Sequence, residues 1–77
     1  MESRGAPPNE PYAYGEILLP GRPLVSCLIA EFSGTGARLE VRSNVGISNT
    51  FDLRAFGRIY PVRVIRRMPR TLLVQFD

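Results

Sequence analysis

The sequence predicts an all-β protein, a small six-stranded antiparallel barrel. Short segments rich in branched and aromatic residues recur along the chain, and turn-forming residues separate them. Residues 37–42 alternate strictly between apolar and charged side chains, which is typical of a half-buried strand. No stretch of ten residues keeps a helical period without a proline or glycine inside it. Short strands spaced in this way favour a small barrel.

The proline-rich start and the apolar runs divide the chain into two parts. Residues 1–11 are polar and contain Pro7, Pro8 and Pro11, so we expect a flexible N-terminal arm there. Residues 12–77 form the predicted barrel domain. Strands are expected at residues 16–19, 24–32, 37–42, 50–53, 58–67 and 71–76. Pro20-Gly21, residues 33–36, Phe56-Gly57 and residues 68–70 are expected to form turns between them.

Alternation along these segments predicts which side chains face the core. The inward residues are expected to be Ala37, Leu39, Val41, Phe51, Leu53, Val62, Val64, Leu72, Val74 and Phe76. Arg38, Glu40 and Arg42 are expected to face water. Pro61 lies inside a strand segment, which favours an edge position or a bulge because proline has no N–H to donate.

Composition argues against several classes of function. The chain has one cysteine and no histidine, so it lacks the material for an internal disulfide, the usual metal ligands and the commonest general base. Cys27 lies in an apolar run and is expected to be a buried, inert thiol. We therefore expect no enzyme and no cofactor. No apolar run is long enough to cross a membrane and no signal peptide is apparent, which favours a cytoplasmic protein without membrane insertion.

The most specific motif is the turn at residues 31–36, EFSGTG, followed by ARLEV. It resembles the signature of bacterial PilZ domains, a D/N-x-S-x-x-G turn that an Ala-Arg-Leu-like strand often follows. Gly21-Arg22 upstream and PVRV at residues 61–64 also match. LLVQF at residues 72–76 is similar to the closing strand of the family, where a glycine is common at the place of Leu73. The resemblance covers roughly residues 14–76.

This resemblance implies a barrel that binds cyclic di-GMP, a bacterial second messenger. In the family, an R-x-x-x-R box in the N-terminal arm grips the phosphates, and the acidic residue and serine of the turn contact the guanine edge. The candidate ligand-binding residues here are Arg4, Glu31, Ser33, Gly36 and Arg38. Arginine forks suit phosphates, and glycines let a ligand approach the backbone.

The match to the binding motif is partial. Glu31 stands where the family has aspartate or asparagine, and its extra methylene would displace the carboxylate. Pro8 stands where the second arginine of the box should be. Losing one charge-assisted fork should cost roughly 1.5–3 kcal/mol, a ten- to hundredfold loss of affinity. Many family members also carry a helix after the last strand, and we expect none here. One end of the barrel would then be left to the arm, a partner or a second copy.

Three functions remain open from the sequence. The first is a non-catalytic regulatory or adaptor module that acts through protein–protein contacts, with weak or absent cyclic di-GMP binding. The second is a genuine receptor in which Arg4, Arg22 or Arg38 replaces the missing arginine. The third is a nucleic-acid-binding barrel that uses exposed Tyr12, Tyr14 and Tyr60 beside basic residues. A net charge of +3 is modest, so a nucleic-acid partner is the less expected one.

Overall fold

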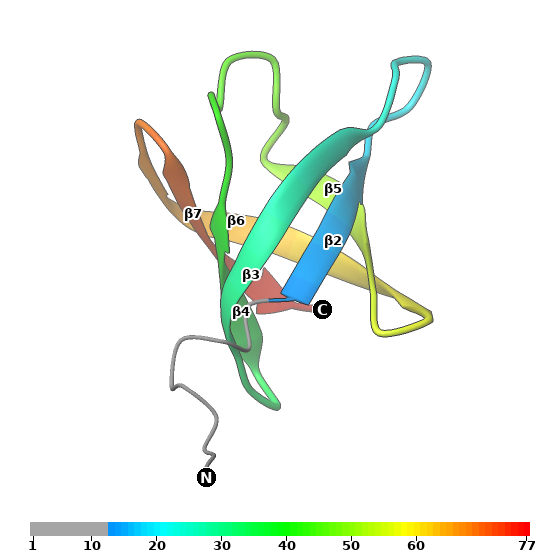
Figure 1. Ribbon diagram of the computed structural model, residues 1–77, viewed down its shortest axis with the longest axis vertical. Coiled ribbons are helices and arrows are strands. Elements are labelled where there is room, and N and C mark those ends of the chain that lie inside the picture. Colours follow the sequence, from blue (N-terminus) through cyan, green and yellow to red (C-terminus); the bar gives the residue numbers. More distant parts are fainter. Residues whose placement is uncertain (1–12) are drawn as a thin grey trace, which may run out of the picture.

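The computed structural model describes residues 13–77, which form a closed barrel of six antiparallel strands (Figure 1). The strands are β2 (Ala13–Leu18), β3 (Val25–Phe32), β4 (Gly36–Glu40), β5 (Thr50–Ala55), β6 (Arg58–Met68) and β7 (Thr71–Phe76). Their order around the barrel is β2-β3-β4-β7-β6-β5. The predicted fold class is confirmed, and no helix occurs within residues 13–77. The predicted arm, with Arg4 in it, lies outside the described residues.

Four of the six contacts around the barrel join strands that follow one another in the chain, and two close it. Strand β4 pairs with β7, in the register Ala37↔Val74, and β2 pairs with β5, in the register Ile17↔Leu53. The first strand begins at Ala13, three residues before the predicted start. Gly15 disfavours a strand in the sequence, but pairing with β3 extends the strand over Tyr14 and Gly15. No helix in this part of the chain has the length and apolarity to cross a membrane.

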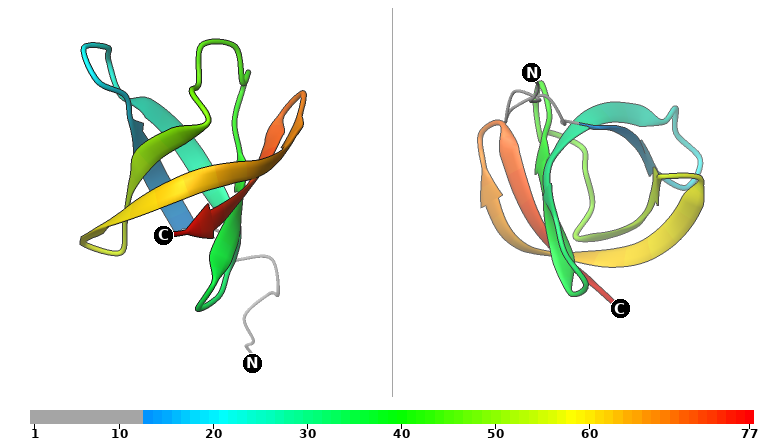
Figure 2. Two further views of the ribbon diagram at one scale, coloured as in Figure 1. Left: turned by 180° about the vertical axis from the view of Figure 1, so that it is seen from behind. Right: turned by 60° about the horizontal axis from the view of Figure 1, so that its bottom comes forward.

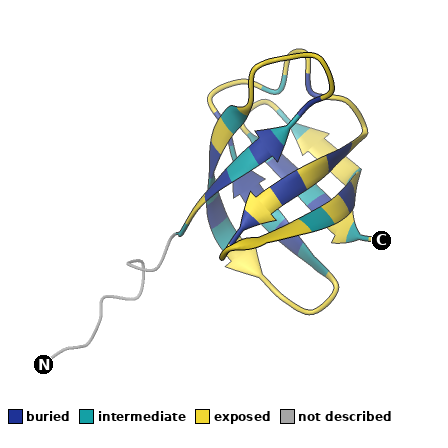
Figure 3. Cartoon of the chain, turned by 90° about the vertical axis from the view of Figure 1, so that its right-hand side faces the viewer, coloured by how far each residue is buried: buried dark blue, intermediate teal, exposed yellow. Residues whose placement is uncertain are grey.

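The core fills the barrel, and buried positions alternate with exposed ones along the strands (Figure 3). The largest fully buried side chains are Ile17, Leu39, Leu53, Leu72 and Val62. Every inward residue that alternation predicted is buried or packs against this core, with Val64 and Phe76 among the partly buried ones. Cys27 is also buried, as predicted. Burial raises the pKa of the Cys27 thiol to about 11, so it stays protonated and unreactive at neutral pH.

Two β-bulges change which way the side chains point. One lies in β3 between Ile29 and Glu31, and the other lies in β6 between Val64 and Arg66. An extra residue in a strand reverses the alternation beyond it. Past the first bulge, Glu31 therefore stands opposite Arg38 on the outer face, and Phe32 pairs with the inward Ala37.

Pro61 is not at a bulge, and the closed barrel has no edge strand. It pairs with Asp52 of β5, and the β6–β7 register begins one residue later, at Val62. Its missing N–H therefore removes no bond from the β6–β7 ladder. Its carbonyl oxygen still accepts a hydrogen bond from the N–H of Asp77, at 3.0 Å.

The two ends of the barrel differ in how the chain connects the strands (Figures 1 and 2). What we call the upper end carries the connections at residues 19–24, 41–49 and 69–70. The lower end carries the turns at residues 33–35 and 56–57, the start of β2 and the end of β7. Arg22 and Arg67 donate to backbone oxygens of Gly46 and Asn44, which holds the 41–49 connection over the upper end.

Candidate functional site

The barrel brings four of the five candidate residues together. Glu31, Ser33, Gly36 and Arg38 line an open groove of about 470 Å³ on the outer face. The groove runs over β3, β4 and β7 and is completed by Ile65, Leu73 and Gln75, among others. Arg4, the fifth candidate, is outside the described residues. The turn and the strand after it thus contribute to one surface groove, and ligand binding by these residues stays a prediction.

Ser33 uses its hydroxyl to build the turn. Its Oγ accepts from the N–H groups of Thr35 and Gly36, at 3.2 and 3.3 Å. The same oxygen lies 3.3 Å from the Gly36 carbonyl, and the Ser33 N–H donates to that carbonyl at 2.9 Å. Hydroxyl groups that cap backbone N–H groups in this way are typical of serine in turns. The side chain is exposed, but a ligand would compete with the turn for its oxygen.

Gly36 has a structural reason to be glycine. A Cβ at this position would lie 2.2 Å from the carbonyl oxygen of Val74, on the neighbouring strand β7. Real Cβ atoms do not approach a carbonyl oxygen so closely, so strands β4 and β7 can lie side by side here only without a side chain. Gly34 differs, because nothing lies within 4 Å of the Cβ it would carry. The close approach of two strands therefore accounts for the last glycine of the motif.

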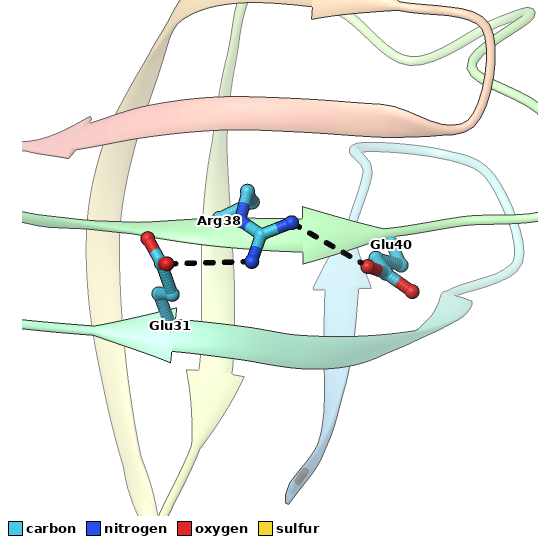
Figure 4. Close-up of polar contacts among 3 residues, drawn as sticks. All are labelled: Glu31, Arg38 and Glu40. Atoms are coloured by element: carbon cyan, nitrogen blue, oxygen red, sulfur yellow. Dashed lines mark hydrogen bonds and ion pairs between the residues drawn. The ribbon is translucent and has the colours of Figure 1, made fainter. Parts of the chain in front are cut away.

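Arg38 lies between two carboxylates (Figure 4). One terminal nitrogen is 3.3 Å from Glu31 Oε2, and the other is 3.7 Å from Glu40 Oε2. The bulge in β3 creates this arrangement, since it places Glu31 directly across from Arg38. One guanidinium and two carboxylates leave the cluster with a net negative charge. Such a surface repels a phosphate unless an additional cation is supplied.

Leu73 changes the floor of the groove. It pairs with Arg38 across the β4–β7 ladder and lines the groove with its side chain. The PilZ resemblance places a glycine at this position, which would leave the space open. Arg22, which the receptor hypothesis offered as a replacement arginine, donates at 3.2 Å to the Gly46 carbonyl at the upper end. The fold therefore does not bring Arg22 to the groove.

A second feature, which sequence reasoning missed, is an aromatic cluster at the lower end. Phe32 lies 4.8 Å from Phe56, 5.4 Å from Tyr60 and 5.2 Å from Phe76, measured between ring centroids. Tyr60 stacks on Phe76 at 5.1 Å. We call these four residues the aromatic end. Tyr60 was expected to be exposed, and that expectation is wrong because this residue packs half-buried in the cluster. Tyr14 is exposed as expected, and Tyr12 lies outside the described residues.

The aromatic end is partly open to solvent. Phe32 is 39% exposed and Phe56 is 57% exposed. Phe56 also has a φ of +53°, in the left-handed region, and Gly57 follows with +74°. These angles form the hairpin turn that normally takes Asn-Gly. A bulky residue in this region costs about 1–2 kcal/mol. In the sequence, the only sign of this cluster is that an aromatic residue, Phe56, stands at a position expected to form a turn.

Within residues 13–77 no three His, Cys, Asp or Glu side chains gather as a potential metal site. Comparison of the chain with models of known protein families, with curated proteins and with solved structures found no match. The groove, the aromatic end and the distribution of charge are the features of the described residues that bear on function.

Proposed function

We propose that this protein is a PilZ-like, non-catalytic regulatory or adaptor module of the bacterial cytoplasm, which acts through protein–protein contacts and binds cyclic di-GMP weakly or not at all. The observation that carries the proposal is the aromatic end. A partner can bury Phe32 and Phe56 together, because both are exposed and their ring centroids lie 4.8 Å apart.

The chemistry of this surface suits protein recognition. Aromatic side chains are enriched at the centres of interfaces, where a few anchors supply most of the binding energy. The rings of the aromatic end are held by edge and stacked contacts, so little side-chain freedom remains to be lost on binding. Phe56 also occupies a strained backbone position that asparagine would fill without strain. An exposed phenylalanine at this strained position supports a role in binding.

Weak binding of cyclic di-GMP follows from the groove. Arg38 is already paired with Glu31 and Glu40, and the Ser33 hydroxyl is engaged by its own turn. Leu73 occupies space that the family keeps open. Pro8 stands at the second position of the arginine box. Each of these features weakens the contact with a guanine edge or a phosphate.

Isothermal titration with cyclic di-GMP tests this part of the proposal. We expect no saturable heat in the low-micromolar range. A variant carrying Pro8→Arg, Glu31→Asp and Leu73→Gly restores the family pattern, and we expect it to bind at least tenfold more tightly than the natural sequence. Saturable, low-micromolar heat from the natural sequence would show a genuine receptor and refute the adaptor proposal.

Phe56→Asn tests the aromatic end. Asn-Gly is the preferred pair for this turn, so the variant should be at least as stable as the natural protein. We expect it to lose partners that the natural protein captures from bacterial lysate. The matched control is Val45→Asn, because Val45 is also an exposed apolar residue but lies in the 41–49 connection at the upper end. Equal retention by Phe56→Asn and the natural protein would exclude the aromatic end as the contact surface.

A further inference from the structure

Among residues 13–77, the arginines at or near the upper connections differ from those in the middle of the barrel in their ion pairs. Arg38, Arg54 and Arg63 each form an ion pair with at least one carboxylate, from Glu16, Glu31, Glu40 or Asp77. The arginines at or near the upper connections form no such pair with any described residue. They are Arg22, Arg42, Arg66, Arg67 and Arg70.

Not all of these arginines are equally available. Arg22 and Arg67 donate hydrogen bonds to the 41–49 connection, including one of 2.8 Å from Arg67 to Asn49 Oδ1. Arg42 and Arg70 make no side-chain hydrogen bond or ion pair within residues 13–77, and both are exposed. The fold brings them together, since the N–H of Val41 donates to the Arg70 carbonyl at 2.9 Å. Both arginines therefore line one groove where β4 ends and the β6–β7 turn passes.

A groove leads from these two arginines down the outer face of the barrel. It has a volume of about 790 Å³, within the range of ordinary ligand sites, and Tyr14, Leu28, Glu40, Arg42 and Arg70 line it. The register places Tyr14 beside Leu28, and Leu28 beside Glu40. Strand spacing and rise then put about 12 Å between the backbone of Tyr14 and that of Arg42. Tyr14 is 80% exposed, so its ring is available for stacking.

We propose that this groove binds a nucleotide unit, and that its natural occupant is single-stranded nucleic acid. The phosphates contact Arg42 and Arg70, and a base stacks on Tyr14. Arginine forks bind phosphate oxygens in two-point geometry, and stacking on an aromatic ring accepts any base. Glu40 lies between these groups, where its carboxylate accepts a hydrogen bond from a base amino group. This site is separate from the cyclic di-GMP groove and does not depend on the proposed function.

Charge complementarity favours a nucleic-acid strand as the occupant of this groove. The local field is more positive than the overall charge of +3 suggests, because Arg22, Arg66 and Arg67 lie at or near the same connections as the two groove arginines, whereas Glu40 is the acidic residue that lines the groove. A nucleic-acid strand bound along these arginines places several of its phosphates in contact with them. Binding should then weaken with salt, with a slope of about −0.7 in log K per phosphate contacted.

Fluorescence anisotropy with a short labelled single-stranded RNA at low salt tests the proposal. We expect saturable binding that Arg42→Gln/Arg70→Gln weakens about tenfold or more. Tyr14→Ala should weaken it about five- to hundredfold, the range measured for loss of one stacked base. The control is Arg58→Gln, which removes an exposed arginine at the lower end and should change the affinity less than twofold. Circular dichroism confirms that each variant is folded.

Competition experiments distinguish a free nucleotide from nucleic acid as the ligand. Competition by a mononucleotide as effectively as by the strand identifies a free nucleotide as the occupant, and competition by the strand alone identifies nucleic acid. Either result supports the site. No binding at low salt overturns the proposal, and so does an equal loss with Arg58→Gln. Binding of heparin and RNA with equal affinity, unaffected by Tyr14→Ala, also overturns it, because the site would then bind charge without a base.

Discussion

Gly36→Ala should unfold the barrel or lower its melting temperature by more than about 12 °C. The new Cβ would lie 2.2 Å from the Val74 carbonyl oxygen, and that atom belongs to a backbone that cannot turn aside. Strands β4 and β7 must separate at one of the two junctions that close the barrel. Overpacking of this kind costs about 3 kcal/mol or more. In a domain of this size each kcal/mol shifts the melting temperature by about 4–8 °C.

The matched control is Gly34→Ala, two residues earlier in the same turn region. Nothing lies within 4 Å of the Cβ it adds, and its φ is not in the left-handed region. Its stability should stay within about 0.5 kcal/mol of the natural protein. Thermal unfolding followed by far-UV circular dichroism measures both variants. Equal melting temperatures for the two would show that Gly36 is not required by strand packing.

Leu39→Ala should destabilise the barrel by about 3–5 kcal/mol. Leu39 is fully buried in β4, where it pairs with Ile29 on one side and Leu72 on the other. Replacing a buried leucine with alanine removes its transfer free energy and leaves a cavity. A domain of about 65 residues has a total stability of only about 3–10 kcal/mol. Urea unfolding should therefore show a variant that is largely unfolded or close to it.

Ile65→Ala is the control for this variant. It removes part of a branched apolar side chain, from the β6 bulge on the outer face, where the residue is exposed. The expected change is within about 0.5 kcal/mol. A Leu39→Ala variant as stable as Ile65→Ala would mean that the barrel interior can collapse around the lost side chain.

The two proposed surfaces lie apart on the barrel. The aromatic end is apolar and faces downward, whereas the groove at Tyr14, Arg42 and Arg70 is basic and begins at the upper end. A protein partner and a nucleic acid could therefore bind together without steric conflict. The groove that Glu31, Ser33 and Arg38 line reaches the lower end, because the 33–35 turn and Phe32 contribute to it.

Local patterns predicted much of this fold. The alternation at residues 37–42 correctly assigned Ala37, Leu39 and Val41 to the core, because side chains along a strand point to opposite faces. The same rule worked for β5 and for the inward residues of β7. It could not place Phe32, because the bulge before Glu31 reverses the alternation, and a bulge depends on the partner strand.

In the candidate site, too, local features were predictable from the sequence, whereas features that depend on a neighbouring strand were not. The motif at residues 31–36 was enough to predict the turn, since the Ser33 hydroxyl acts on neighbouring backbone groups. The reason for Gly36 lies in strand β7 and could not be predicted from the motif. The sequence could not show that Arg38 is neutralised, because Glu31 is brought opposite it only by the bulge. It also misjudged Tyr60, whose burial depends on Phe76 from another strand.

By itself, the sequence determined the class of fold, the strands and most of the core, because alternation and turn chemistry act over a few neighbouring residues. Only the tertiary structure decided the surfaces. Closure of β4 on β7 and of β2 on β5 gathered the aromatic end and separated paired from unpaired arginines, since those contacts join residues far apart in the chain.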